Sequence, residues 1–230
     1  VNAYYNAGVL FDSLGETNQA IRSYQAYYDL SKRADRVEVI FAQADLYRRN
    51  GQLTRASQHY DKYLQQNPKN RSRAIEASFM IADIARKRGQ KSKATEWYKK
   101  TLDMYKASSK KVRDETARFA AESRFMLAQD TLARLNAVKF GTSDKQQAKA
   151  AAEVKKLQDT YINEMKEVIR FDNGPYIVAA LASTGQMFDT IVNLFEKIPV
   201  PAGFKEEEAK QYKQLIQAQI DNLKLEARNS

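Results

Sequence analysis

The sequence predicts an all-α fold in which stacked helical hairpins are followed by longer helices. Three observations support this. The 230 residues include only 8 Gly and 4 Pro, while the helix formers Ala, Leu, Gln, Lys and Glu abound. The first half of the chain repeats itself with a period typical of helical hairpins. The second half has apolar residues at helical spacing, and the 43% hydrophobic content is enough for a core.

The repeat is visible by direct comparison. Residues 37–64 match residues 75–102 at about 11 of 28 positions, and a third copy lies about 36 residues upstream. The shared pairs include Glu38 and Glu76, Phe41 and Phe79, Ala44 and Ala82, Asp45 and Asp83, Arg48 and Arg86, Gly51 and Gly89, Ala56 and Ala94, and Tyr60 and Tyr98. In the upstream copy, Gly8, Phe11, Gly15, Ala20, Tyr24 and Tyr27 take the places of Ala44, Tyr47, Gly51, Ala56, Tyr60 and Tyr63.

Each copy has the pattern of a helical hairpin. A first helix ends at a glycine that can adopt the left-handed conformation, namely Gly15, Gly51 or Gly89. A second helix follows, with a small alanine that lets the two backbones approach.

These copies resemble the tetratricopeptide repeat. They share a small residue in the first helix, an aromatic residue three positions on, a turn glycine, then Ala and an aromatic residue in the second helix; Pro68 supplies the closing proline of the second copy. The departures are Lys32 and Lys106 at the closing position, Ala85 for the first-helix aromatic, and Tyr4, Ile40 and Ser78 for the leading tryptophan. The resemblance covers residues 1–107. It implies a right-handed α–α superhelix whose first helices line a concave face that binds protein partners.

Residues 108–230 are expected to be helical but out of phase with the repeat. One long helix is predicted from Asp114 to about Ala137, and a second after a turn at residues 141–143, with Asp144 as its cap. These two helices suit an antiparallel pair. We expect this half to continue the same solenoid.

Two further helices complete the chain. After a turn at residues 172–174, Pro175 lies in the first turn of a helix that resembles a degenerate repeat helix. An extended linker at residues 198–204 precedes a capping helix that opens at Glu206. The PVP segment, the glutamates and the tyrosine that follow are similar to large cell-envelope repeat proteins of gliding and predatory proteobacteria, a resemblance that implies a periplasmic or envelope location.

The predicted concave face presents aromatic residues between acidic and basic rows. Its candidate residues are Tyr5, Val9, Glu38, Phe41, Asp45, Arg48, Arg49, Glu76, Phe79, Asp83, Arg86 and Lys87. Aromatic and arginine side chains are common in binding hot spots. The alternative is self-satisfaction, in which the acids pair with basic residues of their own helix and the phenylalanines pack between hairpins. Capture of a peptide carboxylate is disfavoured, because Tyr5, Val9 and Asp45 occupy positions where such domains have Lys and Asn.

The net charge of +10 is concentrated in one segment. Residues 71–113 contain 13 basic and 4 acidic side chains, whereas the rest of the chain is nearly balanced. The lysines of this candidate basic patch are Lys91, Lys93, Lys99, Lys100, Lys106, Lys110 and Lys111. The patch is either a solvated face or a docking surface for an acidic protein or a phosphate-bearing surface.

Several function classes are disfavoured. The chain has no cysteine and a single histidine, His59, so thiolate metal sites, disulfides and most imidazole chemistry are absent. No phosphate-binding loop or zinc-protease motif occurs, and we expect no catalytic residue, metal or cofactor. No uninterrupted run of 18 apolar residues and no signal peptide is present. Because a helical pattern is already under way at Val1, we expect the chain to be a processed or excised piece.

The sequence therefore predicts a non-catalytic scaffold that binds a partner protein through the concave face, with the basic patch as a second candidate contact that favours an acidic partner. The alternative is a module that binds nucleic acid or an anionic surface through the third repeat. Self-association is compatible with either function.

Overall fold

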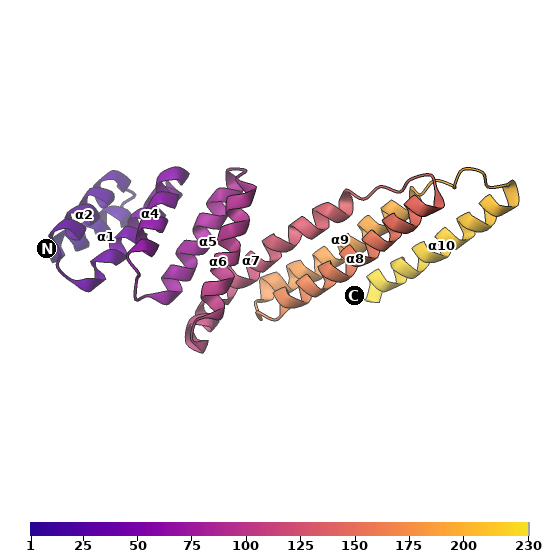
Figure 1. The fold of residues 1–230 in the computed structure, drawn as a ribbon. Coiled ribbons are helices and arrows are strands. Elements are labelled where there is room, and N and C mark those ends of the chain that lie inside the picture. Colours follow the sequence, from indigo (N-terminus) through magenta and orange to yellow (C-terminus); the bar gives the residue numbers. More distant parts are fainter. Residues whose placement is uncertain (230) are drawn as a thin grey trace. The chain divides into compact units, whose positions relative to one another are not determined.

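A computed structural model describes residues 1–229 and confirms the all-α fold (Figure 1). Within these residues there are ten α-helices, one short 3-10 helix and no strand. The helices are α1 (Asn2–Ser13), α2 (Thr17–Leu30), α3 (Glu38–Arg49), α4 (Leu53–Gln65), α5 (Arg71–Lys87), α6 (Lys91–Lys106), α7 (Lys110–Asn136), α8 (Asp144–Ile169), α9 (Gly174–Glu196) and α10 (Glu206–Asn229), and the 3-10 helix η1 spans Ala34–Val37.

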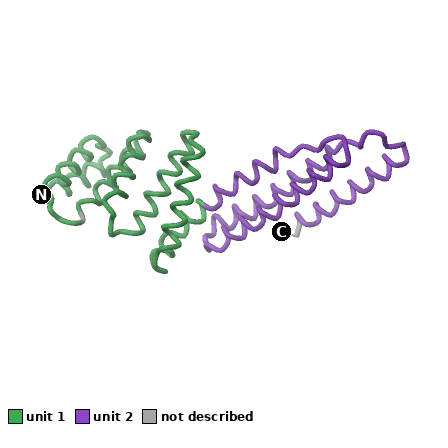
Figure 2. The backbone as a smooth tube through the Cα atoms, in the orientation of Figure 1, with its two compact units in different colours: residues 1–123 green, residues 124–230 purple. Residues whose placement is uncertain are grey.

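The chain divides into two compact units, residues 1–123 and residues 124–230, shown in green and purple in Figure 2. In the first unit, α1 pairs with α2, α3 with α4 and α5 with α6, so each predicted copy forms one hairpin. Helix α2 also packs on α3, and α4 on α5. Hairpins in this unit therefore contact one another in chain order, as in a solenoid.

The hairpin turns confirm the role of the repeated glycines. Gly15, Gly51 and Gly89 have φ angles of 76°, 72° and 71°, in the left-handed region that side-chain-bearing residues rarely adopt. Gly8 has a different role, since a Cβ atom there would lie 2.6 Å from the ring of Tyr24. The absence of a side chain at Gly8 therefore lets α1 approach α2.

Tyrosines and alanines of the second helices form much of the first unit's core. Ala20, Tyr24 and Tyr27 of α2 cluster with Val39 and Leu46 of α3. In the next hairpin Ala56, Tyr60 and Tyr63 are fully buried. In α2 these residues therefore join one hairpin to the next, whereas Tyr60 and Tyr63 pack against Phe41 within their own hairpin.

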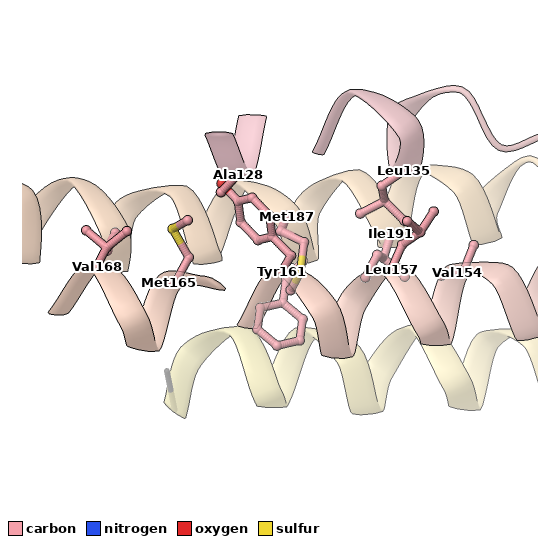
Figure 3. Packing of buried hydrophobic residues seen from close by; sticks show 11 residues of the cluster. Ala128, Leu135, Val154, Leu157, Tyr161, Met165, Val168, Met187 and Ile191 are labelled. Carbon is pink, nitrogen blue, oxygen red and sulfur yellow. The ribbon is translucent and has the colours of Figure 1, made fainter. Parts of the chain in front are cut away.

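The second unit has a core of its own, drawn in Figure 3. Helix α8 contributes the row Val154, Leu157, Tyr161, Met165 and Val168, which packs against Met187 and Ile191 of α9 and against Ala128 and Leu135 near the end of α7. Helix α10 packs on α9, its Ile220 is buried, and its Leu223 and Ala227 pack against the same apolar cluster.

The start of α8 corrects one detail of the sequence-based expectation. The cap is Ser143 and not Asp144: the Ser143 hydroxyl accepts from the Gln146 backbone, and the Gln146 side chain accepts from the Ser143 backbone. This reciprocal arrangement is a capping box, and it satisfies two backbone donors that a lone Asp144 would not. Asp144 instead provides negative charge in the first helical turn.

A buried glutamine ties the segment between α9 and α10 to the start of α8. Gln147 Nε2 donates to the backbone oxygens of Gly141 and Pro199, at 3.0 and 2.7 Å. The Tyr212 hydroxyl in turn donates to Gln147 Oε1. Together with a backbone hydrogen bond from Ala202 to Thr142 at 3.1 Å, this side chain holds the linker against the start of α8.

Helix α9 also meets the length and composition of a membrane-crossing helix, with a mean hydropathy of 1.2 over its most apolar stretch. One third of that stretch is buried within the protein, and α9 packs on α8 and α10. Among residues 1–229, no other helix meets the same criteria.

Candidate functional site

The first helices of the hairpins are joined to one another by ion pairs on the predicted concave face. Arg49 of α3 reaches back to Asp12 of α1 at 2.8 Å, and Arg73 of α5 reaches back to Glu38 of α3 at 2.8 Å. Each arginine is about half exposed, so each pair contributes modestly to stability. The two pairs occupy different repeat positions: Asp12 and Arg49 lie near the ends of α1 and α3, and Glu38 and Arg73 lie near the starts of α3 and α5.

Other charged residues of this face pair within their own helix. Asp45 accepts from Arg48 at 2.5 Å and from Arg49 at 3.2 Å, and Asp83 accepts from Arg86 and Lys87 at 2.7 Å each. Burial opposes ionisation of Asp83, but hydrogen bonds from Lys87 and Arg86 together outweigh it and hold the pKa of the carboxyl below its ordinary value. Asp45 and Asp83 are thus paired with basic residues of their own helices, as the alternative interpretation of this face expected.

The aromatic residues of the face do not form one open ladder. Tyr5 is 45% exposed, and Phe41 is partly exposed with Arg73 above its ring and the rings of Tyr60 and Tyr63 at its edges. Phe79, expected to continue the row, is only 4% exposed. The reason is that Phe119 of α7 packs on Phe79 with 5.2 Å between ring centroids. Phe79 is therefore a core residue.

Glu76 lies among like and unlike charges on the same face. Burial and the nearby Asp45 raise the pKa of the Glu76 carboxyl, while Arg118, Arg73 and Arg48 oppose that shift. Val9 is exposed on α1 one turn after Tyr5. These residues remain accessible from the concave side.

Two adjoining hollows lie where the first helices begin. One has a volume of about 700 Å³ and the other about 450 Å³, and they share Arg33, Glu38 and Arg73. We call the two together the repeat-edge furrow. Its lining residues are Asn2, Tyr5, Asn6, Tyr27, Arg33, Ala34, Val37, Glu38, Lys69, Asn70 and Arg73.

Basic residues outnumber acidic ones among the described side chains that line the furrow. Arg33, Lys69 and Arg73 are basic, and Glu38 is the acidic residue of this described set. That carboxylate already accepts from Arg73 and from the Tyr63 hydroxyl at 3.0 Å. Burial and the nearby Glu38 raise the pKa of Tyr63, so the phenol stays protonated and remains a donor.

Of the concave-face residues expected from the sequence, only Tyr5 and Glu38 line the furrow. The expectation missed Arg33, Lys69 and Arg73, which come from the segments between hairpins and from the first turn of α5. A signal for two of them was present, because Arg33 and Lys69 are 36 residues apart and occupy equivalent positions after the second helix of each repeat.

All seven lysines of the basic patch are exposed. Lys91, Lys93, Lys99, Lys100 and Lys106 lie on α6, and Lys110 and Lys111 begin α7. Lys100 Nζ lies 4.0 Å from the centre of the Trp97 ring, a cation–π contact. Among the described residues, no group of three or more His, Cys, Asp or Glu side chains is arranged to hold a metal ion.

Comparison with protein families gives one result. The family described as tetratricopeptide repeat matches residues 1–33 and residues 37–70, which are the first two hairpins. The third hairpin lies outside these matches but has the same glycine turn. No curated protein matches the chain.

Proposed function

The chain is a tetratricopeptide-repeat protein, and on this premise we propose that it is a non-catalytic scaffold that binds an acidic segment of a partner protein in the repeat-edge furrow. Such repeats generally mediate protein–protein interaction. The observation that supports the furrow is its charge: among the described lining residues Arg33, Lys69 and Arg73 are basic and Glu38 is acidic, and Glu38 already accepts from Arg73 and from Tyr63.

An acidic side chain of a partner is the ligand that these charges favour. Arg33 and Arg73 carry planar guanidinium groups, a group that binds carboxylates through paired hydrogen bonds; Arg73 already holds Glu38, so a partner carboxylate would share it. Lys69 adds a third positive charge at the same hollow. A partner carboxylate there would meet net positive charge in a partly enclosed site, where attraction is stronger than in open water.

The rest of the furrow suits a peptide backbone. Asn2 and Asn6 of α1 line one end together with Tyr5, whose ring packs on Tyr24 and Tyr27. Amide side chains donate to and accept from peptide groups, and a half-exposed tyrosine provides apolar area with one polar end. The furrow therefore favours an extended acidic segment with an apolar residue beside its carboxylate.

The basic patch on α6 is a second candidate contact. Seven exposed lysines lie on α6 and at the start of α7. Their charge would attract an acidic partner over several ångströms and raise its association rate at low salt. The same charge favours the alternative function, binding of nucleic acid or another phosphate-bearing surface.

Peptide selection tests the proposal. A random peptide library selected on the full chain should yield peptides enriched in Asp and Glu, and the double variant Arg33→Glu, Lys69→Glu should lose their binding by at least about tenfold. Two matched controls change charge equally: Lys99→Glu, Lys106→Glu in the patch and Lys145→Glu, Lys149→Glu on α8.

The controls separate the candidate sites. Loss in the patch variant alone assigns the peptides to α6 and contradicts the furrow. Equal loss in all three variants means that only net charge matters. Binding of nucleic acid that the patch variant abolishes, without any acidic peptide selected, would favour the alternative function.

A further inference from the structure

A small hollow lies in the third hairpin, where α5 begins and α6 ends. Its volume is about 120 Å³, and we call it the third-hairpin hollow. The residues that line it are Arg71, Ile75, Met104, Ala107 and Ser108. Ile75 is only 1% exposed, whereas Ala107 is an exposed residue, so the hollow extends from the core of the hairpin to its surface.

The hollow repeats part of the repeat-edge furrow one hairpin further along the chain. At an offset of 38 residues, Arg71, Ile75, Ala107 and Ser108 correspond to the furrow residues Arg33, Val37, Lys69 and Asn70. The same edge of two successive hairpins is therefore hollowed. In the third hairpin the lysine of this set is replaced by an alanine, which makes the lining more apolar.

A difference at the closing position of the repeat accompanies the hollow. Pro68 occupies this position in the second copy and is buried. Lys106 occupies it in the third copy and is exposed. The third hairpin thus has no buried apolar side chain at this position, directly before Ala107.

The lining suits one aliphatic side chain. Ile75, Met104 and Ala107 supply apolar atoms, and the Ser108 hydroxyl is already engaged, since it donates to the backbone oxygen of Met104 at 2.7 Å. An apolar cavity of about 150 Å³ accepts a benzene-sized ligand. A hollow of about 120 Å³ therefore has room for a Val or Leu side chain and little more.

Positive charge is concentrated in the segment that closes the hollow. Residues 99–113 contain six basic side chains and one acidic side chain, Asp103. The lysines among them are all exposed, namely Lys99, Lys100, Lys106, Lys110 and Lys111. The N-terminus of α7 lies in the same segment and also favours negative charge. An apolar hollow is thus combined with a surface that attracts acids.

We propose that the third-hairpin hollow binds one aliphatic side chain, of the size of Val or Leu, from a partner segment whose flanking residues are acidic. The exposed lysines and Arg71 attract the acids, and the hollow buries the aliphatic group. Nucleic acid offers phosphates to the lysines but no aliphatic side chain to the hollow, so the hollow favours a protein partner at the basic patch. No described residue lines both the hollow and the repeat-edge furrow, and the proposal does not depend on the furrow.

Peptides of the form Glu-Glu-X-Glu-Glu test the proposal. Binding is measured on the full chain carrying Arg33→Glu and Lys69→Glu, so that the furrow does not contribute. With Leu at X the peptide should bind at least about tenfold more tightly than with Ser at X, because only Leu buries apolar surface. Equal binding of the two peptides overturns the proposal and leaves the proposal for the furrow untouched.

Two further variants separate the hollow from the charge. Ala107→Leu fills the hollow without a change of charge and should remove the preference for Leu, whereas Lys110→Glu, Lys111→Glu should weaken both peptides. The matched control is Ala152→Leu at an exposed position of α8, which should keep the preference. Circular dichroism checks that each variant keeps its helices. A preference that survives Ala107→Leu, or that the control removes equally, overturns the proposal.

Methyl labelling of the methionines locates the bound side chain. The Met104 methyl resonance, assigned with Met104→Leu, should shift when the Leu peptide is added and move much less with the Ser peptide. Met165 and Met187, in the core of the second unit, serve as internal controls. A single-stranded oligonucleotide should leave Met104 in place. A Leu peptide that does not shift Met104, or an oligonucleotide that shifts it equally, overturns the proposal.

Discussion

The guanidinium of Arg49 in α3 holds the carboxylate of Asp12 in α1, with Nη2 at 2.8 and 3.0 Å from its two oxygens. This contact joins the first helices of two successive hairpins. Arg73 and Glu38 join α5 to α3 in a similar way, at the opposite end of the helices. The face expected to bind partners is therefore partly engaged in fixing the spacing of the repeats.

A double-mutant cycle at Asp12 and Arg49 should detect this coupling. We expect Arg49→Ala and Asp12→Ala each to lower the free energy of unfolding by about 0.5–1 kcal/mol, with a coupling energy of a few tenths, because the pair is partly exposed. Urea unfolding measures it. The coupling should shrink in high salt, and a salt-independent value would contradict an electrostatic origin.

Gly8 should not tolerate a side chain. Gly8→Ala places a Cβ atom 2.6 Å from the Tyr24 ring, which must move within the buried cluster, and we expect a loss of about 1–3 kcal/mol in thermal or urea unfolding. Gly185 in α9 is the control, because open space surrounds it. Gly185→Ala should stabilise the protein by about 0.5–1 kcal/mol, as expected for a helical glycine. Equal effects at both sites would mean that the close approach at Gly8 is unimportant.

The sequence predicted hairpin boundaries well where the signal was local. Gly15, Gly51 and Gly89 need a left-handed backbone, and no tertiary contact alters that requirement. Phe79 was misplaced because its surroundings depend on a helix outside the repeat period: Phe119 of α7 covers it. Periodicity tells which residues share a helix face but not which later element packs on that face.

Asp83→Asn should lower stability in a way that depends on pH. The pKa of Asp83 lies below its ordinary value of 3.8 in the folded protein, so the ionised carboxylate stabilises the fold above that value and the contribution is lost as pH falls through the folded-state pKa. We expect a loss of about 0.5–1 kcal/mol at neutral pH. Urea unfolding at several pH values should show the difference from the unmodified protein vanishing in acid.

Glu76→Gln should behave in the opposite sense. Burial, reinforced by Asp45, raises the pKa of Glu76 above 4.5. Ionisation of this carboxyl therefore destabilises the folded state at pH values above the folded-state pKa. At pH values below 4.5 the carboxyl is protonated in both states, and the destabilisation is absent. The variant should therefore raise Tm at neutral pH and have little effect near pH 4.5 or below. A larger gain in acid than at neutral pH would contradict this assignment.

Gln147→Leu should destabilise the second unit. The substitution leaves the carbonyls of Gly141 and Pro199 and the Tyr212 hydroxyl without their partner, at a cost of about 1–3 kcal/mol. Gln186→Leu on the exposed side of α9 changes the same atoms without such contacts and should have an effect within about 0.5 kcal/mol. Chemical unfolding compares the two.

The furrow was harder to foresee than the hairpins. Glu38 and Tyr5 were expected because each lies on a first helix and has an equivalent in another repeat, Glu76 and Phe41 respectively. Arg33 and Lys69 lie in the segments between hairpins, where helical spacing cannot predict which way a side chain points. The fold brings them to one hollow with Arg73. Comparing equivalent positions in the connecting segments is the step that would have revealed them.

The chain-order contacts of the first unit also set how it opens. Helix α1 pairs with α2 and has no other helix packed extensively against it in the described residues, whereas the α3–α4 hairpin is held on both sides, by α2 and by α5. Opening the end hairpin breaks one inter-hairpin contact and opening the next breaks two. Backbone amides of α1 should therefore exchange their hydrogens with solvent before those of α3, which hydrogen exchange of this chain measures.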